Sequence, residues 1–184
     1  MQKRSHKLLA SSLLRSHCGF AARRYELAFL FGSFQPDCNP FTFLRGTFRG
    51  RTLGGHNFSN SRPYISRKIR LLQQRDRWNI LQYYTLGKLT HYLADAFTFP
   101  HNDHYPAPLM NHHRYEAELR IALQSLLNSS SLLPQRHCRD LTGTIDRLHR
   151  QYASAESSVS IDIHYILHST CLLMTLCPPA LSHP

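Results

Sequence analysis

Apolar residues recur along most of this chain at the three- and four-residue spacing of an amphipathic or buried helix. In the first such segment Leu8, Leu9, Leu13 and Leu14 fall on successive turns, and Gly32 lies where the second segment ends. We predict helices at residues 5–16, 20–32, 63–75, 78–99, 112–129, 139–155 and 158–177. No stretch shows the clear alternation of a strand. The pattern predicts an all-α fold of six or seven helices around one core.

One long stretch, residues 33–62, interrupts the helical pattern with Gly, Pro, Asn, Ser and Phe. This composition predicts a loop, and a loop of that length in a compact domain is usually functional or disordered. The chain has 184 residues, of which 42% are hydrophobic, and this suits one domain with a substantial core. We assign residues 1–178 to a single helical domain and expect residues 179–184 to form a frayed tail.

Two polar residues of the expected fourth helix, His91 and Asp95, are four positions apart and so share one helix face. An imidazole and a carboxylate at this spacing can bind one cation, although such pairs also form ordinary hydrogen bonds. Pro100 is expected to end the helix, which lets His101 fold back over the same face. The segment is therefore either a packed helix with incidental polar residues or half of a metal site.

The same spacing occurs on the next expected helix, where His112 and Glu116 are four positions apart. His113 is the weaker candidate, because the residue four positions after it is Ala117. Adjacent helices with a short connection commonly pack antiparallel, so both His–carboxylate pairs can face one cleft. Together they predict a metal cluster in a cleft between the helices of the bundle.

The long loop adds two further candidates, Asp37 between prolines in "QPDCNP" and His56 after two glycines in "GGHNF". Taken alone, each is an ordinary loop residue. The chain also has 13 histidines in all, and histidine is the commonest metal ligand in proteins.

The segment "HYLADAFTFPH" resembles the signature of the bacterial zinc-dependent phospholipase C family, which is related to zinc-dependent single-strand nucleases. The resemblance rests on His91, Tyr92, Asp95, Pro100 and His101, with proline directly before the second histidine where the family usually has one residue between. The loop aspartate, the loop histidine, the downstream His–Glu pair and an early histidine also follow in the family's order. These further positions are Asp37, His56, His112, Glu116 and His6.

The resemblance implies a cluster of up to three zinc ions held by imidazole and carboxylate groups. The ligands of the first ion would be Asp37, His56, His91 and Asp95. The ligands of the second ion would be His101, His112 and Glu116.

A third zinc ion would use His6, a shared Asp95 and the amine and carbonyl of the N-terminal residue. The family's enzymes begin with tryptophan after processing, whereas this chain begins Met1-Gln2, so we expect two ions and leave the third open. The family also implies a general base at the loop carboxylate, which is Asp37 here.

By this resemblance the protein is a phosphodiester hydrolase that uses a metal-bound hydroxide to cleave a phospholipid or another small phosphodiester. The net charge of +11 favours anionic partners, including an acidic membrane surface contacted peripherally. Two alternatives stay open. One is a zinc-dependent nuclease or 3'-nucleotidase, for which nucleic acid is the less favoured partner, and the other is a non-catalytic zinc-binding homologue.

The five cysteines show no CxxC pairing, and no secretory signal is evident at the N-terminus. No segment offers the roughly twenty uncharged apolar residues of a transmembrane helix. We expect a soluble protein of the reducing cytoplasm, with secretion not excluded.

Overall fold

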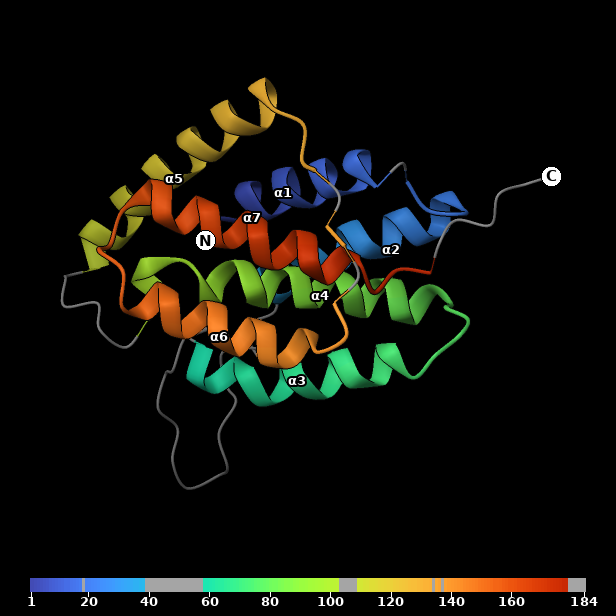
Figure 1. The fold of residues 1–184 in the computed structure, drawn as a ribbon. Helices are drawn as coiled ribbons and strands as arrows, with labels where there is room; N and C mark the ends of the chain where they lie inside the picture. Colours follow the sequence, from blue (N-terminus) through green and yellow to red (C-terminus); the bar gives the residue numbers. More distant parts are fainter. Residues whose placement is uncertain (18, 39–57, 103–108, 134, 137, 179–184) are drawn as a thin grey trace.

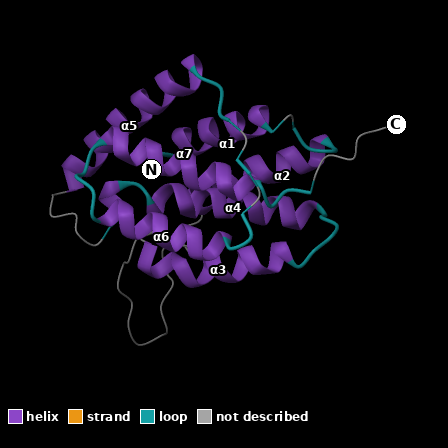
Figure 2. Cartoon of the chain, viewed as in Figure 1, coloured by secondary structure: helices purple, strands orange, loops and turns teal. Residues whose placement is uncertain are grey.

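The computed structural model describes residues 1–17, 19–38, 58–102, 109–133, 135–136 and 138–178. These residues form the helices α1 (Lys3–Ser16), α2 (Arg23–Phe34), η1 (Gln35–Cys38), α3 (Phe58–Gln73), α4 (Ile80–Ala96), η3 (Phe99–His101), α5 (Leu109–Ser129), α6 (Leu141–Ala153) and α7 (Val159–Met174). Figure 2 shows helices and loops, and no strand, across this described part of the chain. The predicted all-α fold is confirmed.

Helix α4 lies at the centre of the bundle, with α2, α3 and α7 packed around it (Figure 1). Asn79 caps its start, because the Asn79 side chain accepts from the Leu81 amide while the Asn79 amide donates to the Gln82 side chain. From Leu86 to Ala96 every residue except Lys88 is buried. Polar side chains in this stretch must therefore find their partners inside the protein.

A pair of glycines lets α2 and α4 approach each other closely. A Cβ atom added to Gly32 would lie 2.2 Å from the carbonyl oxygen of Tyr84, and one added to Gly87 would lie 2.1 Å from that of Phe29. Any side chain at either position would therefore push the two backbones apart. The close contact fixes α2, which leads directly into Asp37, against the helix that carries the first His–carboxylate pair.

The predicted loop at residues 33–62 is wrong at both ends. Helix α2 extends to Phe34 and continues into η1, and α3 begins at Phe58 rather than at residue 63. The middle of the predicted loop, residues 39–57, lies outside the described residues.

Contacts with α6 account for the early start of α3. The ring of Phe58 stacks on that of His149, with centroids 3.7 Å apart. In the next turn Arg62 donates hydrogen bonds of 2.8 and 2.6 Å to the two carboxylate oxygens of Asp146. The Ser- and Asn-containing sequence of this turn favours a loop, and the tertiary contacts override that local preference.

None of the helices within the described ranges is both long enough and apolar enough to cross a membrane.

Candidate metal centre

Three buried side chains from two helices form a first ligand set. His6 comes from α1, and His91 and Asp95 come from α4. Nε2 of His6 lies 3.2 Å from Oδ1 of Asp95, and Nε2 of His91 lies 3.2 Å from Oδ2 of the same carboxylate. One ligand atom from each of the three lies within 4.8 Å of the others. This arrangement suits side chains that share one cation.

Asp37 in η1 faces the first ligand set from the end of α2. Its Oδ1 lies 3.6 Å from Nε2 of His91, and its Oδ2 lies 3.9 Å from Nε2 of His6. The hydroxyl of Tyr84 on α4 donates to the side-chain oxygen of Gln35 at 2.9 Å, which anchors η1. The Asp37 side chain is 19% exposed, so it lies between the buried histidines and solvent.

A second ligand set joins η3 to α5. Nε2 of His101 and Nε2 of His112 lie 3.2 and 3.1 Å from the same oxygen, Oε1 of Glu116. His112 is 23% exposed on its side chain, whereas the neighbouring His113 points outward and is exposed. His112 rather than His113 faces the carboxylate, as the four-residue spacing predicts.

The amino group of Met1 lies between the two ligand sets. Its nitrogen is 2.8 Å from Oδ1 of Asp95, 3.0 Å from Oε1 of Glu116 and 2.7 Å from Nε2 of His101. Burial lowers the pKa of this amine, but the two carboxylates raise it by more, so the group is an ammonium. One buried positive charge is thus shared by both sets, which form a single continuous centre.

The amino-acid sequence matches the family model described as zinc dependent phospholipase C over residues 5–159, a span that includes every predicted side-chain ligand. The chain belongs to the zinc-dependent phospholipase C family. Comparisons with curated proteins and with solved structures gave no significant match. Membership of the zinc-dependent phospholipase C family supports zinc as the metal and hydrolysis of the phospholipase C kind as the general reaction.

The donor atoms of the centre fit the family's zinc, which favours imidazole and carboxylate ligands. Oδ2 of Asp37 and Oδ2 of Asp95 are buried and make no hydrogen bond with the described residues, although histidine nitrogens lie close to both. A buried carboxylate oxygen without a hydrogen bond is costly, and a bound cation would remove that cost.

The backbone of α2 orients the imidazole of His91. Nδ1 of His91 lies 3.0 Å from the carbonyl oxygen of Ser33. A carbonyl oxygen only accepts, so Nδ1 donates to it, and the opposite nitrogen, Nε2, is directed towards Asp37 and Asp95. Metal-binding histidines are commonly held by such a bond from the opposite ring nitrogen.

Burial and neighbouring charges give the ligands the protonation states that a metal requires. Burial is the largest cause that lowers the pKa of His6, to about 3, and electrostatic repulsion by His91 is the next. The His6 ring is therefore neutral. Burial opposes ionisation of Asp95, but the Met1 ammonium and the surrounding histidines hold its pKa well below the usual range. Burial likewise opposes ionisation of Glu116, and the hydrogen bond from His101 together with the ammonium lowers its pKa.

Asp162 on α7 is a structural residue that the sequence did not reveal. Its side chain is fully buried. Its Oδ2 accepts hydrogen bonds from the Phe99 amide at 2.8 Å and from the Tyr115 hydroxyl at 3.0 Å. Its Oδ1 accepts a hydrogen bond from the Tyr152 hydroxyl at 2.7 Å. Phe99 opens η3, and Tyr115 directly precedes the carboxylate of the second ligand set. Asp162 therefore ties that set to α6 and α7. Nothing in the sequence marks it, because its partners come from three distant segments.

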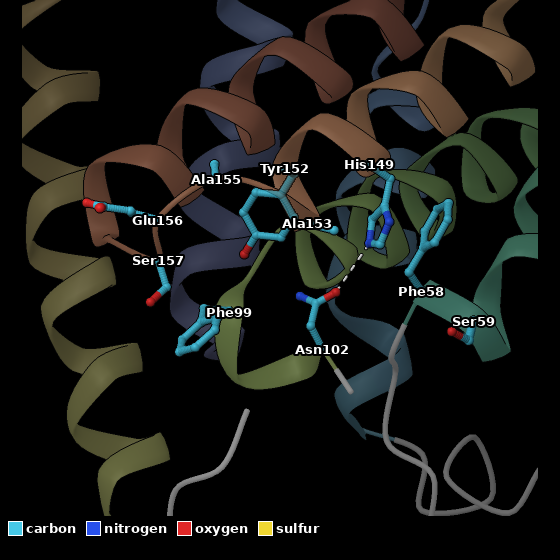
Figure 3. A pocket seen from close by; sticks show the side chains of 10 residues that line it. All are labelled: Phe58, Ser59, Phe99, Asn102, His149, Tyr152, Ala153, Ala155, Glu156 and Ser157. Carbon is cyan, nitrogen blue, oxygen red and sulfur yellow. Dashed lines mark hydrogen bonds between the residues drawn. The ribbon is translucent and has the colours of Figure 1, made fainter. Parts of the chain in front are cut away.

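A pocket of about 170 Å³ opens beside η3 (Figure 3). Its walls include the aromatic side chains of Phe58, Phe99, His149 and Tyr152. Asn102 also lines it, with its side-chain oxygen 3.2 Å from Nε2 of His149. Two of its lining residues, Phe99 and Asn102, flank Pro100 and His101 in the sequence.

All predicted ligands except one meet in this centre. The exception, His56, lies outside the described residues. His6, which the resemblance assigns to a third ion, stacks on His91 with ring centroids 3.9 Å apart, and its Nε2 lies 3.2 Å from Oδ1 of Asp95, the oxygen that the Met1 amine also approaches. The sequence also left the role of the N-terminal amine open, and the structure places it against Asp95.

We expect zinc affinity to fall as the pH drops below 6, because Asp37 then takes up a proton. Burial raises the pKa of Asp37 to about 6 from its ordinary value of 3.8. A raised carboxylate pKa means that the group is ionised above that pH and protonated below it, where a proton competes with the metal. Through this one group, affinity should fall roughly tenfold per pH unit below the pKa. Competition with a zinc chelator at several pH values measures the effect.

Asp37→Asn provides the comparison for this titration. The variant should bind zinc more weakly throughout, with a pH dependence shallower by one proton, because its other ligands are unchanged. An equally steep pH dependence in both proteins would show that Asp37 does not bind the metal.

Proposed function

We propose that this protein is a zinc-dependent phosphodiester hydrolase of the phospholipase C type that cleaves a phospholipid. The observation that carries the proposal is the meeting of two His–carboxylate ligand sets in one buried centre, through the carboxylates of Asp95 and Glu116. The family's description supports the general reaction.

The two ligand groups support one zinc ion each. The first ion would be held by His6, His91 and Asp95 with Asp37 beside them, and His56 is proposed as a further ligand. The second would be held by His101, His112 and Glu116. A third ion would take the place of the ammonium as the positive charge between Asp95 and Glu116, and its nitrogen ligand would be the amine without its proton.

Zinc bound in this centre would supply Lewis-acid stabilisation of the phosphodiester and would make a water molecule acidic enough to attack near neutral pH. The protein's own residues hold and orient that charge. Asp37, Asp95 and Glu116 contribute three negative charges, fewer than the positive charge of two divalent ions. The centre therefore stays cationic and attracts a phosphate group.

Asp37 is the proposed general base. It is the carboxylate of the first set that reaches solvent, at 19% exposure, and burial raises its pKa to about 6. A carboxylate with a pKa near neutrality can accept the proton of an attacking water without being permanently protonated. Its partial exposure would let a water molecule or a substrate reach it from solvent.

The pocket in Figure 3 is proposed to receive an apolar part of the substrate. Aromatic side chains in the wall of a pocket favour the binding of hydrocarbon. The side-chain oxygen of Asn102 and Nε2 of His149 form a hydrogen bond with each other. A phospholipid has both a phosphodiester for the metal centre and a hydrocarbon part for such a pocket.

Two measurements test the proposal. Metal analysis of protein purified without chelator should find at least two zinc ions, matching the two ligand groups. The zinc-loaded protein should release phosphocholine from a short-chain phosphatidylcholine, and chelator treatment should abolish the release. Cleavage of a single-stranded oligonucleotide in place of the lipid would establish the nuclease reading instead. Bound zinc without hydrolysis of either would establish the non-catalytic one.

A further inference from the structure

Four large hydrophobic side chains are exposed on two neighbouring helices. Leu27 and Phe31 of α2 are 55% and 52% exposed, and Ile80 and Leu81 of α4 are 47% and 63% exposed. Helices α2 and α4 pack against each other, and the ring of Phe31 stacks on that of Tyr84 with centroids 5.9 Å apart. We call the surface formed by these five residues the α2–α4 face.

Lysine side chains border the α2–α4 face. Nζ of Lys7 lies 4.4 Å from the centre of the Phe34 ring, which packs against Phe31 with centroids 5.6 Å apart. Nζ of Lys88 lies 5.9 Å from the centre of the Tyr84 ring. The ammonium groups of Lys7 and Lys88 thus lie beside the aromatic rings of Phe34 and Tyr84, next to Phe31 of the face.

A hydrogen bond connects the α2–α4 face to the segment that carries Asp37. Tyr84 donates its hydroxyl hydrogen bond to Gln35, the first residue of η1, and η1 carries Asp37. At the same end Lys7 directly follows His6 in α1. Tyr84 therefore links this face to the segment that carries Asp37.

We propose that the α2–α4 face is the surface by which this protein binds an anionic phospholipid bilayer. Contiguous exposed apolar side chains mark an interaction site, and leucine and phenylalanine suit the boundary between headgroups and acyl chains. Lysine ammonium groups at the border complement the negative charge of anionic headgroups, as does the net charge of +11. The choice of phospholipid rests on the proposed function, because a phospholipase must reach its substrate at a membrane.

Sedimentation with vesicles tests the proposal directly. Full-length protein is mixed with vesicles of phosphatidylcholine and phosphatidylglycerol, and the bound fraction is measured against lipid concentration. The wild type should bind, and the double variant Leu27→Ser/Phe31→Ser should bind at least roughly tenfold more weakly, because two apolar side chains no longer leave water. Leu81→Ser should weaken binding through the other helix of the face.

The matched control is the double variant Ile121→Ser/Leu133→Ser, in which the side chains are 61% and 77% exposed but lie on or beyond α5. It should bind vesicles like the wild type. Replacing Lys7 and Lys88 with glutamine should weaken binding to anionic vesicles more than to vesicles of phosphatidylcholine alone. An equal loss of vesicle binding in the face variant and the control variant would show nonspecific hydrophobic binding and would overturn the proposal.

A second copy of the chain is the competing occupant of the face. If the wild type is a dimer by light scattering, fails to bind vesicles, and becomes a monomer in Leu27→Ser/Phe31→Ser, the face is a self-association surface and the proposal is wrong. The proposal is also wrong if the wild-type protein is a monomer and does not bind the vesicles.

The two proposals fail in different ways. Hydrolysis of a short-chain, monomeric phosphatidylcholine requires only the metal centre, so Leu27→Ser/Phe31→Ser should keep that activity while losing activity on vesicles. If vesicle binding depends on Leu27 and Phe31 but no phospholipid is hydrolysed, the proposed membrane-binding face is supported and the proposed function is wrong.

Discussion

Asp95→Asn is expected to remove the zinc ion of the first ligand set and to lower phosphodiester hydrolysis by more than about 100-fold, the upper range for residues that only orient a metal ligand. Asp95 is fully buried and lies 3.2 Å from both His6 and His91. An amide has one oxygen and no charge, so it cannot bind metal in the same way. Zinc content and hydrolysis of short-chain phosphatidylcholine measure the two losses.

The same substitution should destabilise the protein after zinc is removed. The buried Met1 ammonium is 2.8 Å from Asp95 and would lose one of its two counter-charges, at a cost on the order of 3 kcal/mol in the free energy of unfolding. Glu118→Gln is the control, since Glu118 pairs at the surface with Arg114 and both side chains are largely exposed, at 53% and 83%. A fully zinc-loaded, active Asp95→Asn protein would refute the ligand assignment.

Glu116→Gln is expected to remove one zinc ion and leave the other. Oε1 of Glu116 is the atom that both His101 and His112 approach, at 3.2 and 3.1 Å, whereas the first ligand set does not contain this carboxylate. Metal analysis should therefore find one ion fewer than in the wild type. Hydrolysis should fall by roughly 100-fold or more, because the charge on the phosphodiester is then stabilised by fewer ions.

Helix α5 provides a matched control two residues further on. Glu118 pairs with Arg114 at 3.1 Å, and both side chains are largely exposed, at 53% and 83%. Glu118→Gln should keep the zinc content and the activity of the wild type, because an exposed ion pair contributes little. Loss of every ion from Glu116→Gln would mean that the two ligand sets do not bind metal independently.

The helices were predictable because a helix packed on a core shows its apolar spacing directly in the sequence. The expected segments match the observed ones to within a few residues, except at α3, where Phe58 and Arg62 contact α6. Such contacts join residues far apart in the chain, so local composition cannot report them. The expected helix at residues 78–99 also ends earlier than predicted, because α4 stops at Ala96 and Pro100 belongs to the short helix η3.

The sequence by itself determined the all-α fold, the two His-x3-carboxylate pairs and the family to which they belong, because each depends on spacing along one segment. Only the tertiary structure decided that His6 stacks on His91, that the Met1 amine lies between Asp95 and Glu116, and that Asp162 holds η3 to α5. These arrangements depend on how closely helices approach, as at the glycine pair of α2 and α4. That approach is set by packing in three dimensions, which no periodicity along the chain encodes.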